Sequence, residues 1–247
     1  MSVFATYNIK GGVGKTAAAV NLAWLSAREG ARTLVWDLDP QGAASFYFRI
    51  KPKVKGGSQG IIRGKRKLDD LIKGTDYENL DLLPADFSYR KMDLVLDATK
   101  KPVRRLRKLV KPLVKEYDHI FLDCPPSITL VSENVFYATD ALLVPLIPTT
   151  LSLRTLDQLS KFIDRNGLTR LKLLPFFALV DRRKRLHLDV VDALPRERPE
   201  ILRTHIPNAS EVERMGLERA VLGSFAGESS SMAAFDALWQ EIKSRLG

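Results

Sequence analysis

A glycine-rich stretch near the start of the chain constrains the fold more than any other feature. Residues 8–16 read as a loop that contains three glycines and ends in Lys15 and Thr16. An apolar segment, residues 3–7, precedes it, and a run of helix formers, residues 17–25, follows it. A strand, a glycine turn and the start of a helix therefore meet at one point. Such a junction directs backbone N–H groups and the positive end of a helix dipole at one anion, which predicts a phosphate-binding loop.

The residue types in this loop suit a nucleoside triphosphate. Its glycines let the backbone approach phosphate oxygens without a Cβ clash. Lys15 would place its ammonium group on the β- and γ-phosphates, and the Thr16 hydroxyl would bind Mg²⁺. The usual pattern has a further glycine where this chain has Ile9, and a second lysine, Lys10, stands beside it. A plain glycine turn with two solvated lysines is the alternative, but it does not explain why strand, loop, Lys-Thr pair and helix follow in this order.

Two aspartates follow the next predicted strand. Asp37 and Asp39 come directly after the apolar residues 33–36 and start a turn that ends at Gly42. In doubly wound folds, ligands bind at the carboxyl ends of parallel strands, and alternation along the strand puts both side chains on one side. One carboxylate could approach the metal shell while the other positions an attacking water. A well-formed turn is the alternative interpretation of the same residues.

A third predicted strand also ends in an acid. Residues 119–123 form an apolar segment that closes on Asp123, in the form of a Walker B element. Asp123 would hold Mg²⁺ through a water molecule, because Mg²⁺ keeps much of its hydration shell. Cys124 lies beside it, but Mg²⁺ prefers oxygen ligands, and we interpret this cysteine as a small buried residue.

The alternation of strands and helices predicts an α/β fold of one domain, residues 1–247. It would contain a single doubly wound, mostly parallel sheet with helices on both faces. Right-handed crossovers would then bring Lys15, Asp39 and Asp123 to one edge of that sheet. The predicted strands are residues 3–7, 33–36, 80–84, 119–123, 141–146, 171–180 and 201–208. The predicted helices are residues 17–30, 68–72, 86–98, 100–115, 149–166 and 231–246.

Basic residues outnumber acidic ones, 39 to 29, and they gather in tracts. Residues 43–68 carry eight basic side chains and no acid, with glycines in the middle, which predicts a mobile surface excursion. This tract is either a solvated basic loop or a contact for a polyanion. Residues 100–115 carry eight more and no acid, at the spacing of an amphipathic helix with a basic outer face that Pro112 kinks or ends early. The formal charge of +10 favours a polyanionic partner such as nucleic acid, an acidic protein or anionic lipid. A generally basic surface would give the same total.

Other features exclude whole classes of protein. No apolar run reaches the roughly 18 residues that a membrane-spanning helix requires. The single Cys124 excludes an internal disulfide and fits a reducing cytosol. The stripe of bulky residues in 231–246 is typical of a helix that closes the core, because charged residues interrupt its other face.

Taken together, these residues resemble the ParA/MinD family of deviant-Walker ATPases. The resemblance rests on three motifs in the family's order, residues 10–16, 37–42 and 121–126, and it covers nearly the whole chain. The Asp-Pro-Gln-Gly sequence of the second motif and the turn at Ile206 and Pro207 make the ParA branch the better match. Each motif alone would be a weak signal, whereas the combination is specific.

The resemblance implies an enzyme that hydrolyses ATP to ADP and phosphate with Mg²⁺ and forms an ATP-dependent sandwich dimer. Lys10 would be the signature lysine that reaches the partner's phosphates, much as an arginine finger supplies a cation in trans. Lys15 would act with it on the phosphates of its own chain. Asp39 matches the family's catalytic position, where it orients the hydrolytic water.

The resemblance also assigns the ligands of ATP and Mg²⁺. Asp37 and Asp123 match the family's metal-shell and switch positions, and Thr16 completes the metal set. The positions that match the family's ATP site are Gly11, Gly12, Val13, Gly14, Lys15, Thr16, Ala17 and Pro207.

By the same resemblance, the dimer would bind nucleoid DNA without sequence preference, in the cytoplasm. A ParB-like or other adaptor protein would stimulate hydrolysis and so segregate or position a cargo: a plasmid, a chromosome origin or a protein assembly. No stable insertion into a membrane is expected. The candidate DNA contacts are Arg182, Arg183, Lys184, Arg185 and Arg203.

The chain departs from the family's pattern at two places. Ala17 stands where a second threonine is common, which removes one hydroxyl near the α-phosphate. Asn208 and Ala209 stand where relatives often carry an arginine, so one expected DNA contact is missing.

Two other functions remain open. A MinD-like ATPase would use the positive charge on anionic lipid, and a P-loop metabolic kinase or ligase would act on a small molecule. Lys10 argues against the metabolic enzyme. An iron–sulfur reductase of the nitrogenase-iron-protein type is excluded, because a shared cluster needs two cysteines per chain and only Cys124 is present.

Overall fold

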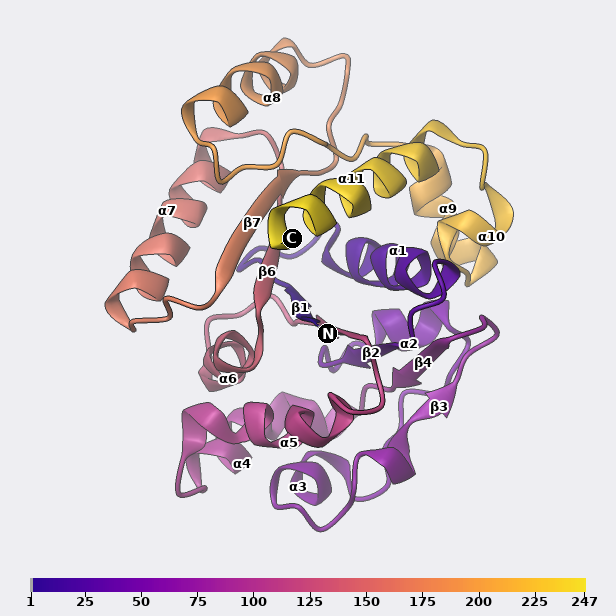
Figure 1. The fold of residues 1–247 in the computed structure, drawn as a ribbon, viewed down its shortest axis with the longest axis vertical. Coiled ribbons are helices and arrows are strands. Elements are labelled where there is room, and N and C mark those ends of the chain that lie inside the picture. Colours follow the sequence, from indigo (N-terminus) through magenta and orange to yellow (C-terminus); the bar gives the residue numbers. More distant parts are fainter. Residues whose placement is uncertain (1) are drawn as a thin grey trace.

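The computed structural model of the chain describes residues 2–247 and is organised around one seven-stranded sheet (Figure 1). The strand order is β3-β4-β2-β5-β1-β6-β7, and all neighbouring pairs are parallel except β3 and β4. The prediction of a mostly parallel, doubly wound α/β sheet is confirmed. The strands are β1 (Ser2–Thr6), β2 (Thr33–Asp37), β3 (Lys73–Gly74), β4 (Leu80–Leu83), β5 (His119–Asp123), β6 (Ala141–Leu146) and β7 (Lys172–Phe177).

Helices cover both faces of this sheet (Figure 1). The α-helices are α1 (Lys15–Arg28), α2 (Ala43–Tyr47), α3 (Gly57–Ile62), α4 (Met92–Asp97), α5 (Arg105–Leu113), α6 (Leu130–Ala138), α7 (Thr150–Arg165), α8 (Arg185–Glu197), α9 (Ser210–Glu218), α10 (Leu222–Phe225) and α11 (Ser230–Leu246). The 3₁₀ helices are η1 (Asp69–Leu71), η2 (Phe87–Lys91) and η3 (Pro102–Arg104). Side chains of α1, α2 and α9 to α11 form one apolar cluster with the sheet, and those of α3 to α7 form the other.

The central strands are apolar at nearly every position because both of their faces are buried. In β1, Val3 and Ala5 belong to the cluster on one face, and Phe4 belongs to the cluster on the other. Phe4 stacks on Phe121 of the neighbouring β5, with ring centroids 4.8 Å apart. None of the helices in residues 2–247 is both long and apolar enough to cross a membrane.

Residues 43–68 fold into two short helices, which corrects the expectation of a mobile surface excursion. Ile61 and Ile62 at the end of α3 are fully buried, and Val54 before it is 5% exposed. The Val54 N–H donates to Asp86 Oδ2 at 2.8 Å, which ties the segment to the start of η2. Three inward-facing aliphatic residues therefore anchor a tract whose many basic side chains point outward.

The prediction of a last strand at residues 201–208 is wrong. This segment is irregular and makes a single isolated parallel bridge, between Val180 and Pro207. Proline has no N–H to continue a ladder. The strand predicted for residues 171–180 ends early, at Phe177, since Leu179 takes a positive φ of 54° that no regular strand allows. The sequence patterns also do not predict β3, α6 or α8 to α10.

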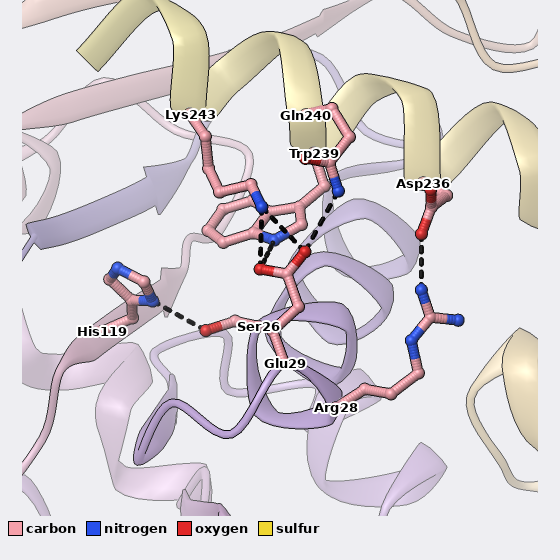
Figure 2. A network of polar contacts seen from close by, with 8 residues as sticks. All are labelled: Ser26, Arg28, Glu29, His119, Asp236, Trp239, Gln240 and Lys243. Atoms are coloured by element: carbon pink, nitrogen blue, oxygen red, sulfur yellow. Dashed lines mark hydrogen bonds and ion pairs between the residues drawn. The ribbon is translucent and has the colours of Figure 1, made fainter. Parts of the chain in front are cut away.

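One carboxylate at the end of α1 accepts hydrogen bonds from three side chains of the C-terminal helix α11 (Figure 2). Glu29 accepts hydrogen bonds from Trp239 Nε1 at 3.0 Å, from Gln240 Nε2 at 3.0 Å and from Lys243 Nζ at 2.7 Å. Burial raises the pKa of Glu29, but these three donors outweigh it and hold the pKa below its ordinary value of 4.5. The charged carboxylate therefore stabilises the closing helix, which was predicted to belong to the core and does.

We expect Glu29→Ala to lower the free energy of unfolding at pH 7 by about 1–3 kcal/mol, because the buried indole N–H of Trp239 loses its acceptor. Because folding lowers the pKa of Glu29, its contribution is present above the ordinary carboxylate range and is lost as pH falls through the lowered value. Urea unfolding at several pH values measures both effects.

Asp236→Ala is the matched control, since Asp236 joins the same two helices through an exposed ion pair with Arg28 (Figure 2). It should change the unfolding free energy by less than about 1 kcal/mol. Equal losses in the two variants would contradict the role given to Glu29, as would a Glu29 effect that does not fade in acid.

Candidate nucleotide-binding site

The glycine-rich loop connects β1 to α1 at the carboxyl edge of the sheet. Gly12 and Gly14 take positive φ values of 68° and 90°, which side chains with a Cβ rarely adopt. A Cβ added at Gly12 would meet nothing within 4 Å, so the backbone conformation, not crowding, requires glycine there. Gly14 forms the N-cap of α1, and its first turn has no side-chain cap. The first N–H groups of the helix are thus available to an anion, as the sequence predicts.

Lys15 lies along this loop and is 7% exposed. Its Nζ donates to the carbonyl oxygen of Lys10 at 2.9 Å. Burial lowers the pKa of Lys15, and the negative charges of Asp123 and Asp39 oppose that shift. The structure therefore brings Lys15, Asp39 and Asp123 together, as predicted, and sets the ammonium group between the loop and the acids.

Three strand ends meet beside Lys15. In the register of the sheet, Asp123 of β5 stands opposite Asp37 of β2 on one side and Thr6 of β1 on the other. The Thr6 hydroxyl donates to Asp123 Oδ1 at 3.2 Å. Burial raises the pKa of both aspartates. The negative charge of Asp39 raises the pKa of Asp37 further, and the negative charge of Asp37 raises the pKa of Asp123 further.

Asp37 is held rigidly by the start of α2. Its Oδ2 accepts hydrogen bonds from the backbone N–H and the hydroxyl of Ser45, at 2.8 and 2.7 Å. Its Oδ1 accepts the N–H of Asp39 at 3.3 Å. The Ser45 hydroxyl also accepts the N–H of Ala85 at 2.9 Å, so one buried serine connects α2, β2 and the end of β4.

Asp123 keeps one carboxylate oxygen without a partner. Oδ2 is buried and receives no hydrogen bond, and the nearby Thr16 side chain lowers the pKa of this carboxyl group. A buried anion with a bare oxygen beside a hydroxyl fits a cation such as Mg²⁺. No group of three or more His, Cys, Asp or Glu side chains with metal-site geometry occurs in residues 2–247. Mg²⁺ suits such a sparse set, because it commonly uses one or two carboxylates and takes its other ligands from phosphate and water.

Asp39 and Lys10 lie on the rim of the site. Asp39 is half-buried, and its Oδ1 accepts the N–H of Gln41 at 2.9 Å inside the predicted turn. The N–H of Lys10 donates to Asn8 Oδ1 at 3.0 Å, which fixes the head of the loop. The Lys10 ammonium makes no hydrogen bond or ion pair within residues 2–247. Both side chains can therefore act on a group outside the buried pair.

The irregular segment that carries Pro207 reaches the same edge. Pro207 bridges Val180, and the N–H of Asn208 donates to the Val180 carbonyl at 3.0 Å. Ala178 lies two residues before Val180. Its Cβ is 3.9 Å from the position that a Cβ on Gly14 would take. Pro207 thus lies at the side of the loop where the end of β7 approaches it.

The candidate DNA contacts Arg182, Arg183, Lys184, Arg185 and Arg203 are all exposed. Arg183 forms a two-pronged ion pair with Asp181, at 3.0 Å for both contacts, and Arg185 pairs with Asp189 at 3.2 Å. Two of the four clustered cations are thus committed to acids of this chain.

The sequence patterns did not predict that Thr6, Asn8 and Ser45 belong to the site. Thr6 could have been predicted, since it is the polar residue that ends an apolar strand. The contact of Ser45 with Asp37 depends on α2 folding back over the end of β2, which no local pattern indicates.

The fold and the loop together define a P-loop nucleotide-binding protein of the α/β class. The family described as an AAA domain matches residues 1–172. The chain is 32% identical to the sporulation initiation inhibitor protein Soj of Bacillus subtilis over 211 residues, 83% of either chain. It is 38% identical to the chromosome partitioning protein ParA of Myxococcus xanthus over 160 residues, which is 64% of this chain but only 56% of that protein.

A solved structure extends this likeness to a nucleotide-bound state. The cobyrinic acid a,c-diamide synthase of Mycobacterium smegmatis, solved with a bound ATP analogue and magnesium, matches 97% of this chain and 93% of its own. The TM-score is 0.82 and the identity 26%. The chain belongs to the ParA/Soj family of P-loop ATPases.

The support of Asp37 can be tested without any ligand. We expect Ser45→Ala to lower the free energy of unfolding by about 1–3 kcal/mol, because Asp37 loses a donor and the buried Ala85 N–H loses its acceptor. Ser224→Ala, at an exposed serine whose hydroxyl donates to the Val221 carbonyl at 2.8 Å, should cost about 1 kcal/mol or less. Urea unfolding measures the free energy of unfolding of both variants. Equal losses in the two variants would contradict the role given to Ser45.

Proposed function

We propose that this chain is a ParA-like ATPase that segregates or positions a cargo. It binds ATP and Mg²⁺ at the glycine-rich loop, forms a sandwich dimer, binds DNA without sequence preference and hydrolyses ATP with the help of an adaptor protein. The observation that carries the proposal is the buried Asp37–Asp123 pair beside Lys15, with Lys10 and Asp39 on the rim of the same site.

In the nucleotide-binding step, the loop residues Gly11 to Ala17 receive the phosphates through backbone N–H groups, with Pro207 at the side. The Lys15 ammonium exchanges the Lys10 carbonyl for phosphate oxygens. Mg²⁺ would supply charge neutralisation at the phosphates. Thr16, Asp37 and Asp123 would hold it, and Asp123 has a carboxylate oxygen without a hydrogen bond for this purpose.

In the hydrolytic step, Asp39 orients the attacking water, for which its half-buried position beside Lys15 is suited. Lys10 stabilises the charge that develops on the partner's γ-phosphate, in the manner of a cation supplied in trans. The unpartnered ammonium at the head of the loop supports this role. Pairing of two such loops explains why ATP, which lies between them, would control the dimer.

The dimer would bind DNA through exposed cations. Arg182, Lys184 and Arg203 make no ion pair within residues 2–247, which leaves their charges for phosphates. In this proposal the protein acts in the cytoplasm, on the nucleoid, together with a ParB-like or other adaptor. The relatives named as a chromosome partitioning protein and as Soj support this role.

An amide-forming P-loop enzyme is the second candidate, because the Mycobacterium smegmatis structure is named as a diamide synthase. Such an enzyme would turn over ATP only with its small substrate and would ignore DNA. A MinD-like ATPase would respond to anionic vesicles instead.

DNA binding with ATP, with ADP and without nucleotide tests the proposal. We expect Lys15→Ala to lose the ATP-dependent part of DNA binding. Asp39→Ala should keep the dimer and its DNA binding but hydrolyse ATP roughly 100-fold more slowly, the scale of losing a positioned acid–base group. Lys161→Ala and Asp164→Ala, exposed residues of α7, are the matched controls. Normal hydrolysis by Asp39→Ala would overturn its role, and wild-type binding that ignores nucleotide would overturn the DNA step.

Light scattering with a non-hydrolysable ATP analogue tests the trans lysine. The wild type should become a dimer and Lys10→Ala should remain mostly a monomer, because the partner's phosphates lose their second cation. Lys161→Ala should dimerise normally. A wild type that stays monomeric under these conditions contradicts the sandwich dimer itself.

A further inference from the structure

A basic hollow of about 930 Å³ lies at the opposite edge of the sheet from the glycine-rich loop. Val3, at the start of β1, and Asp140, just before β6, line it, whereas the loop follows the end of β1. Its rim carries Lys100, Lys101, Arg104, Arg107, Lys108 and Lys111, from η3, α5 and the turn before them. We name this feature the α5 groove.

The cations of the α5 groove are not neutralised by the protein. None of these six side chains forms an ion pair within residues 2–247, although Arg183 and Arg185 of the other basic cluster do. The one acidic residue in the groove, Asp140, already accepts the N–H of Val3 at 2.8 Å. Such a concentration of unpaired positive charge attracts anions from outside the chain.

The cations are arranged in a row. Arg104, Arg107 or Lys108, and Lys111 recur at helical spacing along the outer face of α5, while Leu106 and Val110 are buried on its inner face. The row is about 10 Å long at 1.5 Å per residue. Duplex DNA offers one phosphate charge per roughly 1.7 Å of its axis, so a regular row of flexible cations suits this repeating anion.

Few aliphatic residues are exposed in the groove, because Val3 and Val110 on its floor are 3% and 2% exposed and Ile62 is fully buried. The groove nevertheless offers apolar surface, to which the stems of the lining lysine and arginine side chains contribute. The choice of ligand therefore rests on the charges. A regular row of unpaired cations matches the repeating phosphates of duplex DNA better than it matches a lipid chain.

A second hollow of about 310 Å³ continues the groove. It shares Arg104 and Arg107 and runs towards Arg170 in the turn before β7. The positive surface is thus elongated, as an extended polyanion requires.

We propose that the α5 groove binds the phosphate backbone of DNA without sequence preference, as a surface separate from Arg182–Arg185. The further consequence rests on the proposed dimer. Because a sandwich dimer joins the edges that carry the nucleotide loops, it leaves the two α5 grooves at opposite ends, facing away from each other. One ATP-bound dimer then holds two DNA segments. Affinity for long DNA rises with ATP because two weak sites are linked, without any change in the groove.

The test compares two variants with the same loss of charge. In the groove variant, Arg104, Arg107, Lys108 and Lys111 are replaced by glutamine, and in the control, Lys53, Lys55, Lys65 and Lys67 are. All eight side chains are exposed, and the control lysines do not line the groove. The probe is a random-sequence DNA duplex, titrated without nucleotide and with ATP at several salt concentrations. Circular dichroism and urea unfolding check that both variants are folded.

We expect the groove variant to bind at least about tenfold more weakly in both nucleotide states, and its slope of log affinity against log salt to fall by up to roughly 3.6, at about 0.9 per phosphate contact. The control should stay within about threefold. Equal losses in the two variants would overturn the proposal, as would a groove variant that binds like the wild type. It would also fail if the groove cations governed binding to poly-glutamate or to phosphatidylglycerol vesicles rather than to DNA.

A bridging assay separates this inference from the proposed function. Bead-bound DNA should capture a second, labelled duplex only with wild-type protein and ATP. Lys15→Ala should keep the weak single-groove binding and lose bridging. If no dimer forms, bridging disappears while the groove variant still binds DNA more weakly than its control. This result would refute the proposed dimer and support DNA binding by the α5 groove. If ATP-dependent dimers bind DNA but never bridge it, the groove assignment fails and the proposed function stands.

Discussion

The rest of this structure depends on the electrostatics of two carboxylates that are buried side by side. Asp37 and Asp123 are register partners on adjacent strands, and neither is exposed. Placing two anions in a low-dielectric interior costs free energy unless partners offset it. Ser45 and Thr6 donate to them, and the Lys15 ammonium lies nearby, yet one oxygen of Asp123 remains bare. The site is therefore built to gain stability from a bound cation, and whatever binds there also stabilises the fold.

This electrostatic demand explains the conformation of the loop as well. Burying Lys15 lowers its pKa, and only the nearby acids make its charged form tolerable. The loop must fold back over the lysine for its carbonyl at Lys10 to accept the ammonium, and the positive φ angles of Gly12 and Gly14 permit that path. Glycine spacing, buried lysine and paired acids are thus parts of one arrangement in this chain.

Prediction from sequence succeeded where a local pattern decides the structure. The parallel strands are apolar runs, and the acids at their ends follow from the rule that ligands bind at that edge. It failed where contacts distant in sequence decide. Residues 201–208 have strand-like composition but only one bridge, at Pro207. Ser45 reaches Asp37 only through the path of α2. The basic tract of residues 100–115 was recognisable, but its groove also needs Val3 and Asp140, whose distance along the chain hides their proximity.

The two charged edges of the sheet are too far apart to influence each other directly. A strand of five residues such as β1 spans about 16 Å at 3.3 Å per residue, whereas the Debye length is about 8 Å at physiological salt. A phosphate charge at the loop would therefore barely change the potential at the α5 groove. If nucleotide controls DNA binding in this chain, it must do so through the geometry of the dimer and not through the electric field. The apolar, tightly filled sheet between the edges, with Phe4 stacked on Phe121 at its centre, favours the same conclusion because it has no evident second packing.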